Sequence, residues 1–358
     1  MPDWTTRTLA GITTRLFGRQ SLNKPFSLGR LASSARRVLI IPASGLAEAL
    51  LVYPALSLLR QVLPDARLIC VVQDGQGDIL TEDDVVDDFV KLPQVKGTRG
   101  IWGYRGFVSE IRERMIDAVF HFDFRHDFYR LILPLLSGAS LRLKLKGDIG
   151  YPLFNIEIVP SPQSTYFYEL NLALVRFLSS SQDNVRPWKL PEKEAKIARE
   201  IVRFRKANPA DLMVGVDLSY GKSGERPPFD VEIRLARSFA ALQPSRIALL
   251  ADMQPAIKEE EIKRLGTYDW LDIPRKSFRD TLGILSQCDL LISANTNLFH
   301  FAVSMGVPAF VLFSAKDDRR WIPSQGKYHL VEESEWASTS PAKLAMKMRD
   351  FLRTPSKA

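Results

Sequence analysis

The chain has 358 residues, of which 46% are hydrophobic and 25% are charged, and its formal net charge is +8. This length exceeds what one hydrophobic core usually holds, so two domains are expected. Only two cysteines occur, Cys70 and Cys288, which excludes a disulfide-rich secreted fold and favours a reducing cytoplasm. The positive charge favours an anionic partner, either a nucleic acid, a phosphorylated sugar or a membrane surface.

Residues 1–37 form a basic leader with seven lysines and arginines and a single acid, Asp3. Leu9, Ile12 and Leu16 recur within it at helical spacing. One interpretation is an amphipathic helix on an anionic membrane. The alternative is a loosely packed or disordered tail, and the pattern leaves both open.

After the leader, strand-like apolar runs alternate with helical patterns, which is typical of βαβ units on parallel sheets. The first series occupies residues 38–185 and ends near a polar segment with two prolines, SQDNVRPWKLPEKE, which we expect to be the linker. A second series occupies residues 186–340, and residues 341–358 form a closing helix and tail. The alternation predicts an α/β protein with two doubly wound domains, and ligands of such folds bind at the carboxyl ends of the strands.

The segment DLLISANTNLFHFAVSMGVPAFVLF reads as a strand, a polar turn, a helix and another strand. Asn295 and Thr296 suit the N-cap position of that helix. A helix that begins at the carboxyl edge of a sheet offers backbone N–H groups to a phosphate, and His300 follows one turn later. The alternative is that the two residues only cap the helix and His300 packs between helix and sheet.

This segment resembles the signature of glycosyltransferase family 9, a strand ending in D-[ST]-G-x-x-H, then a helix, G-V-P and a strand ending in L-F. DDRRWIP is similar to the T-D-P segment that follows in the family. Asn295 stands where the family has Asp, and Asn297 where it has Gly. The matching residues are Thr296, His300, Gly306, Val307, Pro308 and Phe313.

The amino-terminal segment VLIIPASGLAEALLVYPALSLLRQVLPDARLICVV is similar to the opening of the same family. Ser44 matches a loop serine, and Glu48 falls where the family has the aspartate proposed as general base. Ala47 replaces the glycine before it. The resemblance implies that Glu48 takes the proton from an acceptor hydroxyl. The alternative is an exposed acid in the first helical turn, where the helix dipole favours it.

Two further segments carry candidate ligands. The loop LSYGKSGERPPFD, with Ser219, Lys222 and Arg226, corresponds in place to the family's K-x-W-P loop, and its cations would neutralise the departing nucleoside diphosphate. HFDFRHDFYRL resembles a family strand end that faces the acceptor, which implies that Arg125, His126 and Arg130 bind acidic groups of the acceptor. A solvated turn in the first case, and salt bridges to Asp123 and Asp127 in the second, are the alternatives.

The resemblance implies two Rossmann-like domains of the GT-B architecture facing across a cleft. It also implies an inverting transfer of a sugar, a heptose, from a nucleoside-diphosphate sugar to an acidic glycolipid or lipopolysaccharide core. The alternatives are a catalytically degenerate relative that acts as a binding or assembly subunit, and a nucleotide-sugar epimerase of the same fold.

We expect no metal or other cofactor, because no D-x-D triplet, H-E-x-x-H or paired C-x-x-C occurs. Nucleic acid is not the expected partner, because the basic residues gather in the leader and no stacking-aromatic motif occurs. The expected location is the cytoplasm, with peripheral binding through the leader to the inner face of the membrane.

Overall fold

The computed structural model describes thirteen stretches of the chain. It divides the chain into two compact units, one ending at Pro187 and the other beginning at Trp188. The leader before residue 34, including its proposed helix, lies outside the described residues, and the predicted cleft stays a prediction. The described stretches are residues 34–73, 75–80, 84–95, 97–123, 127–150, 152–162, 166–178, 185–205, 208, 210–219, 229–252, 270–271 and 277–354.

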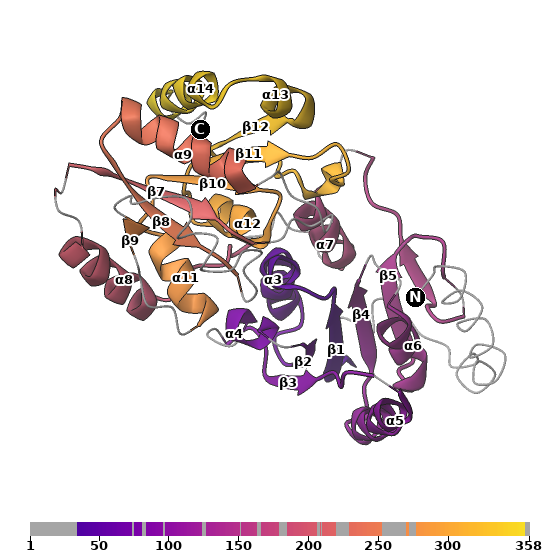
Figure 1. The fold of residues 1–358 in the computed structure, drawn as a ribbon. Helices are drawn as coiled ribbons and strands as arrows, with labels where there is room; N and C mark the ends of the chain where they lie inside the picture. Colours follow the sequence, from indigo (N-terminus) through magenta and orange to yellow (C-terminus); the bar gives the residue numbers. More distant parts are fainter. Residues whose placement is uncertain are drawn as a thin grey trace. The chain divides into compact units, whose positions relative to one another are not determined.

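The first unit is a six-stranded, fully parallel sheet of order β3-β2-β1-β4-β5-β6, with helices on both faces (Figure 1). This is the doubly wound order, in which the chain reverses direction across the sheet between its first and fourth strands. Its elements are β1 (Arg37–Pro42), α3 (Leu46–Val62), β2 (Arg67–Val72), α4 (Gln76–Leu80), β3 (Asp88–Lys91), α5 (Gly97–Glu113), β4 (Ala118–Phe122), α6 (Phe128–Leu136), β5 (Leu141–Leu145), β6 (Ile156–Ile158) and α7 (Phe167–Arg176).

Helix α3 is buried on nearly every side because its sequence is apolar all round. It packs against α7, α4 and β1. The side chain of Asn171 on α7 donates a buried hydrogen bond of 3.0 Å to the carbonyl of Leu51 on α3. Helix α3 is therefore fixed by its contacts with α7, α4 and β1.

The second unit repeats the topology, with a parallel sheet of order β12-β11-β10-β7-β8-β9. Helices α9 and α14 cover one face and α8, α11 and α12 the other (Figure 1). Its elements are α8 (Glu192–Arg205), β7 (Leu212–Asp217), α9 (Phe229–Leu242), β8 (Ser245–Leu250), β9 (Trp270–Leu271), α11 (Phe278–Leu285), β10 (Leu290–Ala294), α12 (Asn297–Ser304), β11 (Ala309–Phe313), the 3₁₀ turn η2 (Arg319–Trp321), β12 (Tyr328–Glu332), α13 (Glu333–Ser338) and α14 (Pro341–Arg353).

The closing helix is part of the second unit's core. Leu344, Ala345 and Met348 of α14 are fully buried and pack with α9 and the sheet. Helix α8 begins at Glu192, inside the segment expected to be a linker. Among the described helices, none is long and apolar enough to cross a membrane.

Candidate functional site

In the first unit, the loop that follows β1 is held by one buried side chain. Gln76 of α4 donates to the carbonyls of Ala43 (2.7 Å) and Gly45 (2.9 Å), and its own carbonyl accepts from the N–H of Gln73 (3.0 Å). Gln76 is completely buried, whereas Ser44 in the loop is partly exposed. The loop lies at the edge between β1 and β4, where doubly wound folds bind ligands.

Gly45 is the N-cap of α3, and Glu48 lies in its first turn. Gly45 has φ of +126°, a conformation that residues with a β-carbon rarely adopt. The carboxylate of Glu48 lies over Gly45, in the place that a β-carbon would fill. Only 6% of Glu48 is exposed, so it is not the exposed acid of the alternative interpretation. Its role as general base stays a prediction.

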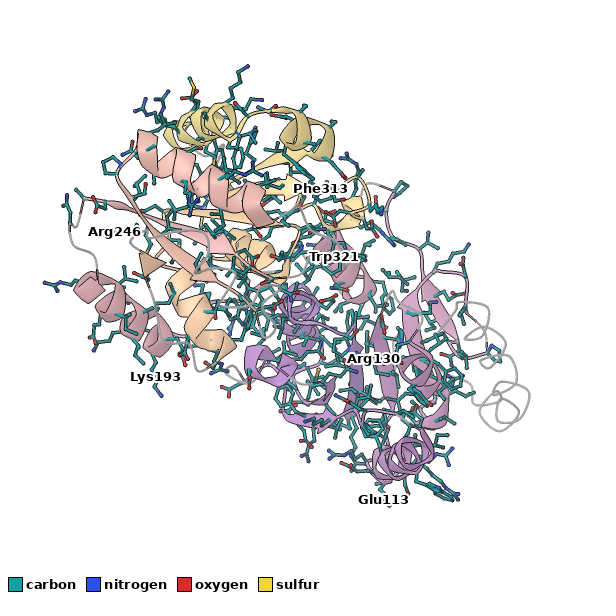
Figure 2. All side chains as sticks on the ribbon, in the orientation of Figure 1. Glu113, Arg130, Lys193, Arg246, Phe313 and Trp321 are labelled. Carbon is teal, nitrogen blue, oxygen red and sulfur yellow. The ribbon has the colours of Figure 1, made fainter. Side chains whose placement is uncertain are left out.

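Arg130, labelled in Figure 2, is fully buried in the first unit. Its Nη1 donates to the carbonyl of Pro42, the last residue of β1. Asp127 is the N-cap of α6, because its carboxylate accepts hydrogen bonds from the N–H groups of Tyr129 and Arg130. Burial lowers the pKa of Arg130, and nearby carboxylates, including that of Glu48, oppose this shift.

The proposed contact of Arg130 with an acceptor stays a prediction. Arg130 is buried and binds the end of β1, directly before the loop that leads into α3 and Glu48. It therefore supports this loop as well. Arg125 and His126, the other two candidates on this segment, lie outside the described residues.

His121 of β4 is a buried titratable group that the sequence did not single out. Its ring is 97% covered and lies edge-on to Phe154, with 5.0 Å between ring centroids. Burial lowers the pKa of His121 to about 3, and the positive charges of Lys144 and Arg130 act in the same direction. The imidazole is therefore neutral at physiological pH.

In the second unit, a polar network joins the ends of β7 and β10. Asp217, the last residue of β7, is 1% exposed. It accepts hydrogen bonds from the N–H of Ser219 (2.8 Å), the hydroxyl of Ser293 (2.8 Å) and the hydroxyl of Thr296. These strands are the first and fourth of the unit, so the network occupies its topological switch point.

Thr296 is the N-cap of α12, as predicted, and its hydroxyl oxygen accepts from the N–H of Phe299 (3.4 Å). Asn295 is completely buried, and within the described ranges neither atom of its amide has a hydrogen-bond partner. The Nδ2 of Asn297 donates to the carboxylate of Asp252 (2.9 Å), the second residue after β8. The three consecutive residues therefore have three different environments.

His300 is 1% exposed on α12. Its ring centroid lies 5.2 Å from that of Trp321 in η2 and 5.1 Å from that of Phe299. Figure 2 labels Trp321 and also Phe313, the last residue of β11. This aromatic environment is compatible with the packing interpretation, and binding of a nucleotide by His300 stays a prediction.

Of the candidates in the loop after β7, Ser219 is described. It is fully buried, and its hydroxyl accepts from the N–H of Asp252 (2.9 Å). Lys222 and Arg226 lie outside the described residues. In the part of the chain that the structure describes, no three His, Cys, Asp or Glu side chains are grouped to hold a metal ion.

Sequence reasoning missed Gln76, Asp217, Asp252 and Ser293. One signal was present for Asp217, because an acid that ends an apolar strand, as in MVGVDLS, lies at the binding edge of a parallel sheet. Gln76 carries no such signal, since it lies 31 and 33 residues from its partners in the loop.

No family model and no curated protein sequence matches the chain. Solved structures do match it, and the following three each cover 88% of its length. A glycosyl transferase of family 9 from Veillonella parvula DSM 2008 has a TM-score of 0.69 at 14% identity and is covered over 97% of its own chain. The ADP-heptose lipopolysaccharide heptosyltransferase II of E. coli has a TM-score of 0.68 at 16% identity, with 98% covered. The E. coli heptosyltransferase WaaC, solved with ADP-2-deoxy-2-fluoro heptose, has 0.63 at 15%, with 99% covered.

The chain has the fold of these glycosyltransferases. Its two parallel doubly wound sheets and this likeness confirm the predicted GT-B class and the structural resemblance to family 9. A UDP-GlcNAc 2-epimerase from Methanocaldococcus jannaschii shares the architecture more distantly, with a TM-score of 0.51 at 11% identity over 90% of this chain and 94% of that one.

Proposed function

We propose that the chain is a glycosyltransferase that uses a nucleoside-diphosphate sugar. The observation that carries the proposal is the polar loop at the switch point of the second unit, where Thr296 caps the start of α12 at the carboxyl edge of the sheet. The first-turn N–H groups of a helix and its dipole favour a diphosphate in such a position. The fold shared with the heptosyltransferases supports the same assignment.

In this proposal the second unit holds the donor. Residues 295–297 form the diphosphate loop, and Ser219, Lys222, Arg226 and His300 support it. ADP-heptose is the donor we propose, because similar structures are named for, or were solved with, ADP-heptose compounds. Stabilisation of the leaving diphosphate would come from cations and N–H groups without a metal ion.

The first unit would present Glu48 as the general base, and the transfer would invert the anomeric centre. A carboxylate held in a fixed place beside a helix start can accept a proton from an attacking hydroxyl. The acceptor we propose is an acidic glycolipid or lipopolysaccharide core, bound by Ser44, Arg125, His126 and Arg130. The protein would work in the cytoplasm at the inner face of the membrane, with the leader as the membrane-binding segment.

The decisive experiment follows ADP release from ADP-heptose with lipopolysaccharide that lacks its core heptoses. Release that depends on the acceptor supports the proposal, and activity that persists in EDTA supports metal independence. Glu48→Gln should lower kcat by at least 100-fold, because it removes the base. Glu113→Gln is the matched control, since Glu113 is exposed on α5 (Figure 2).

A catalytically degenerate binding subunit is the second candidate, and the substitutions at positions 48, 295 and 297 favour it. It predicts no turnover with any donor and no rise in Tm with ADP or UDP. An epimerase would convert a nucleotide sugar, such as UDP-GlcNAc, with no acceptor present. Following both ADP release and the identity of the sugar in the same incubation distinguishes the three candidate functions.

A further inference from the structure

Asp217 has no assigned role in the proposed function, yet its carboxylate binds Thr296 in the diphosphate loop, residues 295–297. It ends β7, is 1% exposed, and lies beside β10 in the sheet. Burying an ionised carboxylate is costly unless several donors compensate it. Among the described residues three donors bind this carboxylate, and two of them belong to the segment of residues 293–296.

The two oxygens of the Asp217 carboxylate accept hydrogen bonds from different partners. Oδ1 accepts the N–H of Ser219, and Oδ2 accepts the hydroxyls of Ser293 and Thr296. The two hydroxyl oxygens are themselves 3.0 Å apart. One carboxylate therefore joins the loop after β7 to the loop that starts α12.

The carboxylate of Asp217 determines how α12 is capped. An ionised carboxylate only accepts, so it directs the Thr296 proton towards itself. The lone pairs of the Thr296 oxygen are then available to the N–H of Phe299, which is the bond that caps α12. A donor at position 217 would disturb this arrangement.

We infer that Asp217 is the positioning residue of the diphosphate loop, residues 295–297. From the neighbouring strand, its carboxylate binds the hydroxyls of Ser293 and Thr296, which lie on either side of residue 295 in the sequence. The same carboxylate binds the N–H of Ser219, so the start of α12 is fixed to the loop after β7. The inference rests on the proposed function, since it concerns the same loop.

The first test is Asp217→Asn, which keeps the side-chain volume. An amide has one acceptor oxygen, so its NH₂ must face either the N–H of Ser219 or the two hydroxyls. We expect a lower Tm and at least a tenfold rise in the Kd for ADP, measured by calorimetry. The matched control is Asp289→Asn at the opposite end of β10, where the carboxylate accepts the N–H of Met213 (2.7 Å). It should leave the Kd unchanged.

The second test is a double-mutant cycle. Ser293→Ala removes one of the hydroxyls bonded to Asp217, so Asp217→Asn combined with Ser293→Ala should lose less Tm and less ADP affinity than the sum of the two single variants. Additive effects in this cycle would overturn the inference, and so would an unchanged Kd in Asp217→Asn.

The cycle separates this inference from the proposed function. If the wild-type chain binds neither ADP nor UDP, the proposed function fails, and the Tm cycle in the absence of nucleotide still tests the coupling of Asp217 to Ser293. If Asp217→Asn does not fold, Ser293→Ala alone should raise the Kd for ADP, and an unchanged Kd in that variant would contradict the inference.

Discussion

The carboxylate of Glu48 lies over the backbone of Gly45, in the space that a side chain at position 45 would need. Gly45 meets two requirements there. Its φ of +126° turns the chain from β1 into α3, and its missing β-carbon leaves room for the acid. The glycine therefore determines where the proposed base lies.

Gly45→Ala should destabilise the protein and displace Glu48. The positive φ alone costs about 1–3 kcal/mol for a residue with a β-carbon. The clash with the carboxylate adds to this cost. Urea unfolding measures the loss, and the double variant Gly45→Ala with Glu48→Ala should recover the part that is due to the clash.

Gly138 provides the matched control for this prediction. It also has a positive φ, of +78°, but a β-carbon there would meet no atom within 4 Å. Gly138→Ala should therefore show only the backbone cost. Equal losses at the two glycines would mean that Glu48 does not depend on the missing β-carbon.

Buried His121 should make the protein less stable in acid. The pKa of His121 is about 3 in the folded protein, against about 6.5 in an unfolded chain. Between these values the unfolded chain binds more protons, so stability is complete above pH 6.5 and falls as the pH drops towards 3. The slope is on the order of 1 kcal/mol per pH unit.

The measurement is the free energy of unfolding between pH 4 and pH 8 for the wild type and His121→Asn. The variant lacks the titrating group, so its curve should be flatter below pH 6.5. Carboxylates such as Asp88 and Asp318, whose pKa values are lowered by arginine partners, contribute equally to both curves. Parallel curves would show that His121 is not the source of the slope.

Much of the fold could be predicted because both sheets consist of apolar runs, for example VLIIP in β1 and LLISA in β10. The cap at Thr296 was also predictable, since capping depends on residues within one turn. Such local signals are sufficient to predict these strands and the residue at which α12 starts.

The polar supports of the site were not predictable in this way. Asp217 and Thr296 are 79 residues apart in sequence and meet only because β7 and β10 pair. Strand β5, with the sequence LRLKL, was missed because its two cations suggest an exposed segment. In the structure Arg142 is fully buried, since backbone carbonyls satisfy it.

Arg142 should be much more sensitive to substitution by lysine than an exposed arginine of the same unit. Its guanidinium donates to the carbonyls of Ala139 (2.7 Å), Leu153 (2.8 Å) and Pro152 (3.3 Å). A lysine cannot reproduce this planar set of donors, so Arg142→Lys should cost about 2–4 kcal/mol. Urea unfolding tests this, with Arg36→Lys as control, because the Arg36–Asp65 pair is exposed. A loss no larger than in the control would contradict the prediction.

Asn297 should contribute more to stability than to nucleotide binding. Its side chain is engaged with Asp252, whose own N–H donates to Ser219, so it ties the start of α12 to the residues after β8. Any contact of Asn297 with a phosphate would then come from its backbone N–H. Asn297→Ala should lower stability by about 1–2 kcal/mol, since a hydrogen bond to a charged group is lost.

The same substitution should change the Kd for ADP by less than threefold, because the backbone donor remains. Asp252→Ala should cost a similar amount of stability. The double variant should lose less stability than the sum of the two single losses, since both single variants break the same Asn297–Asp252 hydrogen bond. A tenfold loss of ADP affinity in Asn297→Ala would show that the side chain leaves Asp252 to bind the diphosphate. The asparagine would then be a ligand at the position where the family has glycine.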